Sequence, residues 1–249
     1  MSKTLVLGGT SEASALARAL ATRGDEALFS YAGRTAAPVA QPLPTRVGGF
    51  GGVDGLVDFL TAEQITRVVD ATHPFAARMS ANAVTACALA GVPLAAFERM
   101  PWRAGAGDDW RLVPDLAGAV AALPKQPARV FLAIGKQTLD AFATRPQHHY
   151  LLRLVDPPKG PLPLANAQAV IARGPFELDG DTALLRDHRI DLIVAKNAGG
   201  TGAQAKLLAA RALRLPVILI DRPKVADRTV LNNLEDVLAW LDHTARLGV

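Results

Sequence analysis

The chain contains a single cysteine, Cys87, and few aromatic residues. One cysteine excludes an internal disulfide, and its apolar surroundings at residues 83–90 indicate a buried packing role, which is common for a free cysteine. Aromatic residues make up only 5% of the sequence, so the core must be built from Leu, Val, Ile and Ala.

Long apolar runs are also missing. The first one, residues 5–7, stops at Gly8, which argues against a signal peptide. The most apolar window, residues 83–97, is interrupted by Gly91 and Pro93 and is too short to span a bilayer. We therefore expect a soluble, cytoplasmic protein that does not contact a membrane.

The usual motifs of metal and nucleophile sites are absent. No His, Cys or carboxylate cluster has metal-ligand spacing, and the adjacent His148 and His149 would point to opposite faces of an extended segment. The sequence has no Gly-x-Ser-x-Gly elbow and no Walker loop. A net charge of +4, scattered along the chain, does not argue for nucleic acid but suits an acidic small molecule. We expect no resident metal and no nucleic-acid partner.

Short β-like runs alternate with helical stretches almost throughout the chain. In the first half, the pattern predicts strands at residues 4–7, 27–31, 45–47, 67–71 and 92–97, and helices at 11–23, 53–61 and 74–90. In the second half, it predicts strands at 129–134, 150–154, 169–172, 192–195 and 216–220, and helices at 116–123, 137–143, 177–189, 204–213 and 234–243. This alternation predicts α/β architecture with parallel sheets covered by helices on both faces. The length of 249 residues favours one sheet per half, with domains at 1–100 and 101–249.

Two polar turns in the first half suggest nucleotide binding, because ligands of open parallel sheets bind beyond the carboxyl ends of the strands. The turn Gly9-Thr10-Ser11-Glu12 offers glycine backbone and a helix N-terminus to a phosphate, or it is an ordinary turn with a capped helix. Arg34 and Thr35 follow the second strand, where an arginine suits the 2′-phosphate of NADP. An exposed arginine at a strand end is the alternative.

Three further turns follow later strands. Thr72 and His73 lie between a strand and a helix expected to start at Pro74, and Asp70 is interpreted as orienting that turn. His73 is either an acid or base or, as is commoner for a lone histidine, a structural hydrogen-bond partner. In the second half, Gly135-Lys136 and Lys196-Asn197-Ala198-Gly199-Gly200 place a lysine beside glycine near a helix N-terminus, where anions collect. Ordinary surface lysines are the alternative.

Taken together and in order, these turns resemble the precorrin-6A reductase family of cobalamin biosynthesis. The resemblance is carried by residues 7–13 (LGGTSEA), 32–35 (AGRT), 48–52 (GGFGG), 70–76 (DATHPFA), 131–135 (FLAIG), 173–176 (RGPF), 196–200 (KNAGG) and 221–223 (DRP). It covers essentially the whole chain, and DATHPFA is its most specific part. Ala198 departs from the serine expected in the family turn.

The resemblance implies two Rossmann-like domains with mainly parallel sheets and a ligand cleft between them. It also implies an NADPH-dependent reduction of one double bond of precorrin-6A, giving precorrin-6B. Hydride would come from the nicotinamide, whereas the proton source stays open among His73, Lys136 and water. The residues expected to bind the cofactor are Gly9, Thr10, Ser11, Glu12, Arg34, Thr35, Thr72, Gly135, Lys136, Lys196, Asn197, Gly199 and Gly200. The cations expected to bind the carboxylates of the tetrapyrrole are Arg78, Arg99, Arg103, Arg153, Arg173, Arg222 and Lys224.

Other functions stay open at this stage. One is an NADP-linked reductase of an ordinary small substrate, and another is a nucleotide-binding module without catalysis. A methyltransferase is a more distant third, because Arg34 would then lack a phosphate partner. The choice between the metal-free substrate and its cobalt complex also stays open, as does transient contact with neighbouring enzymes of the pathway.

Overall fold

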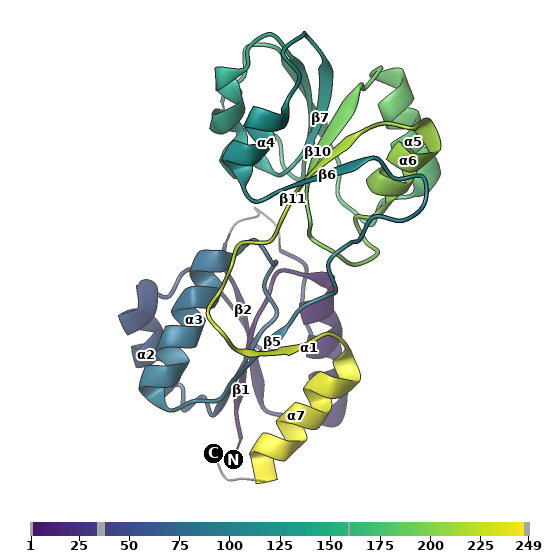
Figure 1. Ribbon diagram of the computed structural model, residues 1–249. Coiled ribbons are helices and arrows are strands. Elements are labelled where there is room, and N and C mark those ends of the chain that lie inside the picture. Colours follow the sequence, from purple (N-terminus) through teal and green to yellow (C-terminus); the bar gives the residue numbers. More distant parts are fainter. Residues whose placement is uncertain (1, 34–37, 159, 247–249) are drawn as a thin grey trace. The chain divides into compact units, whose positions relative to one another are not determined.

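A computed structural model describes residues 2–33, 38–158 and 160–246 and divides the chain into two compact units (Figure 1). Unit 1 consists of Met1–Met100 and Lys224–Val249, and unit 2 of Pro101–Pro223. Each unit contains one six-stranded sheet in which all the strand pairs are parallel. The predicted α/β class, with helices on both faces of two parallel sheets, is confirmed.

The sheet of unit 1 lies between two pairs of helices. Its strands are β1 (Thr4–Leu7), β2 (Ala27–Tyr31), β3 (Thr45–Val47), β4 (Arg67–Asp70), β5 (Leu94–Phe97) and β12 (Thr229–Leu231), in the spatial order β12-β5-β4-β1-β2-β3. The helices are α1 (Ser11–Arg23) and α7 (Leu234–Arg246) on one face, and α2 (Gly52–Ala62) and α3 (Ala77–Ala90) on the other. Val6 packs under α1 and α7, whereas Leu5 and Leu7 pack under α2 and α3, because side chains alternate along a strand.

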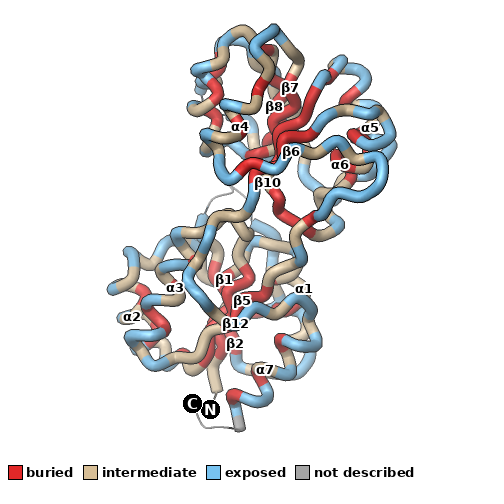
Figure 2. Tube along the Cα trace, in the orientation of Figure 1, coloured by how far each residue is buried: buried red, intermediate tan, exposed pale blue. Residues whose placement is uncertain are grey.

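Unit 2 repeats this plan. Its strands are β6 (Trp110–Val113), β7 (Arg129–Ala133), β8 (His149–Leu154), β9 (Ala167–Ile171), β10 (Leu192–Lys196) and β11 (Val217–Ile220), in the order β6-β11-β10-β7-β8-β9. Helices α5 (Leu178–Asp187) and α6 (Ala205–Leu213) cover one face, and α4 (Leu116–Ala122) and the 3-10 helix η1 (Lys136–Thr144) the other. Figure 2 shows that the strands are the most buried part of each unit.

Unit 1 takes its sixth strand from beyond unit 2, whereas the six strands of unit 2 are consecutive in the chain. β1 to β5 form unit 1 with β12, which follows unit 2 in the chain, and β7 to β11 form unit 2 with β6, which precedes them. The expected domain at 101–249 therefore needs correction: residues 224–249 belong to unit 1, because β12 pairs in parallel with β5 through Thr229 and Ala95. The sequence pattern also missed β6 and β12 themselves.

Local differences from the expected elements have identifiable causes. The helix expected from residue 74 begins at Ala77, because residues 73–76 form a turn in which the Ala76 amide donates to the His73 carbonyl at 2.7 Å. The helix expected at 137–143 is a 3-10 helix with a kink at Thr138. Cys87 is buried in α3, as expected, and burial raises the pKa of its thiol to about 12. Within the described ranges, no helix is long and apolar enough to cross a membrane.

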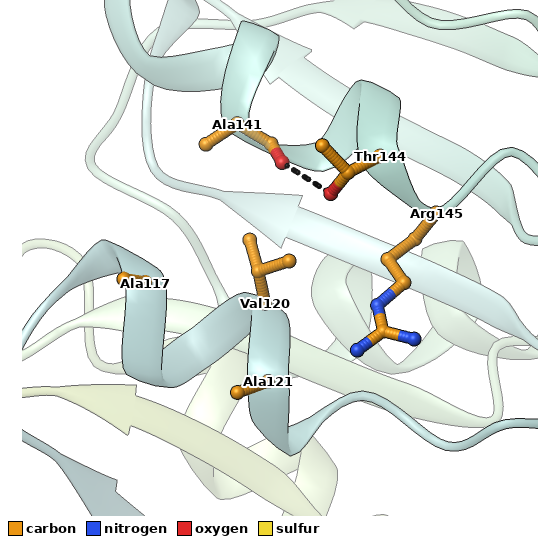
Figure 3. A pocket seen from close by; sticks show the side chains of 6 residues that line it. All are labelled: Ala117, Val120, Ala121, Ala141, Thr144 and Arg145. Carbon is orange, nitrogen blue, oxygen red and sulfur yellow. Dashed lines mark hydrogen bonds between the residues drawn. The ribbon is translucent and has the colours of Figure 1, made fainter.

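A hollow of about 400 Å³ lies between α4 and η1 of unit 2 (Figure 3). Its lining is small and mostly apolar, and consists of Ala117, Val120, Ala121, Ala141, Thr144 and Arg145. The Thr144 hydroxyl is engaged, because it donates to the Ala141 carbonyl at 3.0 Å. With a single cation and no converging polar groups, this hollow does not have the character of a polar ligand site.

Candidate functional site

The strand order reverses between β1 and β4 in unit 1 and between β7 and β10 in unit 2. Adjacent helices leave to opposite faces at such a point, and the carboxyl ends of the two strands then open a crevice where ligands bind. The turns after these four strands are the predicted turns at residues 8–12, 71–75, 135–136 and 197–200. Arg34 and Thr35, which follow β2, lie outside the described residues.

The β1 turn is shaped by two glycines. A Cβ on Gly8 would lie 2.1 Å from the ring of Phe29, so only glycine lets the turn pack on this buried side chain. Gly9 has φ +126°, and a Cβ there would meet nothing within 4 Å. Its backbone therefore borders open space next to the N-terminus of α1, where the helix dipole favours an anion.

Thr10 joins the β1 turn to the β4 turn. Its hydroxyl caps α1 by accepting from the Ala13 amide at 3.1 Å, and it donates to the Ala71 carbonyl at 2.8 Å. The buried Asp70 carboxylate accepts from both the amide and the hydroxyl of Thr72, at 3.1 and 2.7 Å. The two turns at the switch point of unit 1 are thus one hydrogen-bonded structure.

Replacing Thr10 with valine is expected to lower the free energy of unfolding by about 1–2 kcal/mol, because a helix cap and a hydrogen bond are both lost. Urea denaturation followed by circular dichroism measures this loss. Thr10→Ser keeps the hydroxyl and is the matched control, for which we expect less than about 0.5 kcal/mol. Equal losses in the two variants would show that the hydroxyl does not join the turns.

His73 is half-buried at the start of the β4 turn. Its Nδ1 accepts from the Phe75 amide at 3.2 Å, so a neutral imidazole in this position carries its proton on Nε2. The ring therefore has a structural bond on one nitrogen and a donor on the other. Both readings of His73, structural and acid or base, are compatible with this geometry.

Glu12 and Arg99 form an ion pair beyond the carboxyl ends of the strands of the same sheet. Arg99 follows β5, and its Nη1 lies 3.5 Å from Oε2 of Glu12 in the first turn of α1. Ser11 is exposed and its hydroxyl donates to the Glu12 carboxylate at 3.0 Å. A residue expected to bind the cofactor and one expected to bind the substrate therefore contact each other.

In unit 2, the β7 turn is open to solvent. Gly135 has φ +78° with nothing within 4 Å of a built Cβ, and Lys136, the first residue of η1, is exposed. The short, kinked 3-10 helix offers a poorer dipole than α1 does. Lys136 therefore supplies most of the positive charge at this turn.

The β10 turn is held from both sides. Asn197 is 2% exposed, and its carboxamide accepts from the Trp102 amide at 2.8 Å and donates to the Trp102 carbonyl at 3.2 Å. Arg222 donates from Nε to the Asn197 carbonyl at 3.0 Å and from Nη2 to the Ala198 carbonyl at 3.1 Å. The side chains of Asn197 and Arg222 thus hold the turn, and ligand binding by these two residues stays a prediction.

The remaining groups of the β10 turn are two glycines and a lysine. Gly199 and Gly200 both have positive φ, +72° and +71°, which lets the backbone turn sharply. Lys196 is half-buried, and burial lowers the pKa of its ammonium group.

The other predicted cations differ widely in their surroundings. Arg153 is buried in an ion pair with Asp181, whereas Arg78, Arg103, Arg173 and Lys224 are exposed. Arg78, Arg99 and Lys224 belong to unit 1, and Arg103, Arg153, Arg173 and Arg222 belong to unit 2.

Two residues that shape the sites were not singled out from the sequence. Trp102 anchors the β10 turn, since its Nε1 also donates to the Gly200 carbonyl at 2.8 Å. Arg46 lies 4.0 Å from the ring centroid of Phe50 and donates to the carbonyls of Gly48 and Gly49 at 3.0 and 3.1 Å. The glycine-rich run at residues 48–52 signals this tight turn, but nothing in the pattern shows which side chain holds it.

A parallel sheet in the order 3-2-1-4-5-6, with glycine turns at the point where the order reverses, defines the Rossmann-like class of α/β proteins. The chain contains two such sheets, and each has a glycine-containing turn at its switch point. The chain belongs to the precorrin-6x reductase family CbiJ/CobK, whose family model matches residues 3–242.

Individual relatives agree with this assignment over nearly the full length. The precorrin-6A reductase of Rhodobacter capsulatus is 70% identical over 246 residues, which cover 98% of each chain. The precorrin-6A reductase of a Sinorhizobium species is 48% identical, with 97% of this chain and 93% of the relative covered. The solved structure of a CobK precorrin-6A reductase matches with a TM-score of 0.96 at 69% identity, covering 98% of this chain and 97% of that one.

Proposed function

We propose that the chain is an NADPH-dependent reductase that converts precorrin-6A to precorrin-6B in cobalamin biosynthesis. The observation that carries the proposal is the full-length similarity, at 70% identity, to a protein that bears this activity in its name. The metal-free substrate is proposed rather than its cobalt complex, because the two relatives described above are both named for precorrin-6A itself.

The nucleotide is assigned to the switch point of unit 1. The open backbone at Gly9 and the N-terminus of α1 fit a pyrophosphate, because unpaired amides and the helix dipole converge there. Thr10 holds this turn in place, and Ser11 and Glu12 supply the first amides of the helix. When bound, NADPH supplies hydride to an electrophilic carbon of the conjugated macrocycle.

Positive groups at the carboxyl edge of unit 2 are proposed to hold the negative groups of the bound ligands. Lys136 and Lys196 lie at the switch point, and Arg173 is exposed just beyond β9. Precorrin-6A carries acetate and propionate groups, for which arginine is the natural bidentate partner. Arg153 is not assigned to this role, because its guanidinium is already paired with Asp181.

The direct test is turnover of purified protein with NADPH and precorrin-6A, followed by loss of NADPH absorbance and by mass of the product. A gain of two hydrogens in the tetrapyrrole is the expected result. Cobalt-precorrin-6A in a parallel reaction tests the metal-free assignment, and faster reduction of the cobalt complex would overturn it. Binding of NADPH with no oxidation by either tetrapyrrole would show a binding module instead of a reductase.

Arg34→Ala is expected to weaken NADPH binding on the order of tenfold and to leave NADH binding unchanged. The reason is that an arginine beyond β2 suits the 2′-phosphate, and a charge-assisted hydrogen bond is worth about 1.5 kcal/mol or more. Isothermal titration calorimetry with both nucleotides measures the difference. Arg18→Ala, at an exposed position of α1, is the control for general loss of charge. Equal weakening of both nucleotides would remove Arg34 from the 2′-phosphate.

A further inference from the structure

The first segment that connects the two units begins and ends beside a switch-point turn. The chain leaves unit 1 after Met100, and Arg99 and Trp102 lie on either side of this boundary. Arg99 contacts the β1 turn within unit 1, and Trp102 contacts the β10 turn within unit 2. Only Met100 and Pro101 lie between these two residues in the sequence.

The contact at the unit 1 end is electrostatic and sensitive to an anion. Arg99 and Glu12 have side-chain exposures of 15% and 21%, so their attraction is only partly screened by water. Glu12 belongs to the first turn of α1, where we assign the pyrophosphate. A phosphate at that place repels the Glu12 carboxylate and competes with it for the Arg99 guanidinium, because both anions are natural partners of arginine.

The contact at the unit 2 end is a rigid set of hydrogen bonds. Trp102 is 8% exposed and is held by its amide, its carbonyl and its indole Nε1, all three bonded to residues 197–200. The ammonium group of Lys206 lies 4.9 Å from the indole centroid. A shift of Trp102 therefore changes the shape of the β10 turn, because no bond in the set can be kept by side-chain rotation alone.

The second segment that connects the two units, where the chain returns to unit 1, also contacts the β10 turn. Arg222 precedes the second boundary, at Pro223, and bonds to the carbonyls of Asn197 and Ala198. Both connections of the chain thus meet at the β10 turn, and the first also contacts the β1 turn through Arg99 and Glu12. The first connection therefore joins a residue that contacts one switch-point turn to a residue that contacts the other.

We propose that the segment from Arg99 to Trp102 couples the two switch-point turns, so that a nucleotide bound at the β1 turn changes the ligand affinity of the β10 turn. This inference rests on the proposed function, since it takes the β1 turn as the nucleotide site. Arg99 and Trp102 act as positioning residues in this scheme, and neither needs to touch the reacting atoms. Thermodynamic linkage requires the effect to be reciprocal, and couplings of this kind are typically about 5- to 150-fold.

The fluorescence emission of Trp102 can report a change in the surroundings of its indole. The chain has three tryptophans, so Trp110→Phe with Trp240→Phe leaves Trp102 as the only indole. Titration with NADP⁺, which supports no reduction, is followed by tryptophan emission and by calorimetry in parallel. We expect the emission of Trp102 to change with the same midpoint as the heat of binding. A protein that retains only Trp110, a residue of β6, is expected to show no change.

Arg99→Gln tests whether the ion pair between Arg99 and Glu12 carries the coupling. In the Trp102-only protein this variant is expected to remove the emission change at NADP⁺ concentrations that calorimetry shows to saturate the variant, and Arg111→Gln, at an exposed position of β6, is the matched control. Glu12→Gln breaks the same ion pair from the other side and gives a second variant should the first fail to fold. With wild-type protein, NADP⁺ is expected to change the Kd of precorrin-6A about fivefold or more, and Arg99→Gln to abolish that change.

The outcomes separate this inference from the proposed function. Binding of NADP⁺ without any change at Trp102, or a change that survives in both Arg99→Gln and Glu12→Gln, overturns the coupling and leaves the reductase proposal standing. An unaltered Kd of precorrin-6A in the presence of NADP⁺ also overturns the coupling. Absence of any heat or emission change with NADP⁺ overturns the nucleotide assignment, and the coupling with it.

Discussion

Asp181→Ala is expected to lower the free energy of unfolding by about 3–5 kcal/mol, because it leaves the guanidinium of Arg153 buried without its counter-charge. The two groups are 2.5 Å apart, and their side chains are 8% and 6% exposed. Arg153 also lies 4.0 Å from the ring centroid of Phe176 and 5.0 Å from that of Phe131, so it cannot swing into water without losing both stacking contacts. Urea denaturation followed by circular dichroism measures the loss.

Two variants make this result specific. Asp179→Ala removes an exposed carboxylate from the same first turn of α5 and is expected to cost less than about 1 kcal/mol. Asp181→Leu combined with Arg153→Met removes both charges and is expected to recover most of the stability, as replacement of a buried ion pair by apolar groups often does. A loss no larger than that of Asp179→Ala would show an exposed, weak pair, and Arg153 would again be a candidate for substrate binding.

Arg153 illustrates what the sequence could not predict about the site. Its position near a strand end was visible, but the partner that neutralises it comes from α5, and no local pattern specifies that pairing. Asn197 is a similar case, because its carboxamide is bonded to the backbone of Trp102, 95 residues away in the sequence. Sequence patterns predicted where polar groups gather, since parallel strands bring all carboxyl ends to one edge, but not which of them bind one another.

The fold, like the site, was predictable from sequence only where the signal is local. The buried central strands were predicted well, because they are continuous apolar runs bounded by polar turns. The missed strands β6 and β12 are the edge strands of their sheets, of four and three residues, and they expose Leu112 and Val230. Such strands carry little burial pattern, and their membership in a sheet depends on pairing across long stretches of chain. The return of β12 to the sheet of unit 1 was therefore not predictable from local signals.

His73→Asn is expected to lower kcat on the order of 100-fold while leaving NADP⁺ affinity unchanged, if the imidazole supplies the proton of the proposed reduction. Asparagine is chosen because its side-chain carbonyl can accept from the Phe75 amide, as Nδ1 of His73 does, and so keeps the turn while removing the donor at Nε2. His73→Ala removes both the turn bond and the donor. Single-turnover oxidation of NADPH with precorrin-6A measures the rate.

The pair of variants separates the two readings of His73. Slow turnover in both variants supports a proton donor, whereas slow turnover in His73→Ala alone shows that the bond to the Phe75 amide matters and the imidazole does not. Normal turnover in both removes His73 from the chemistry. Lys136→Gln then becomes the decisive variant, because Lys136 is the exposed cation at the switch point of unit 2 and the other side chain considered as proton source. Loss of rate in that variant with unchanged binding of both ligands would assign the proton to its ammonium group.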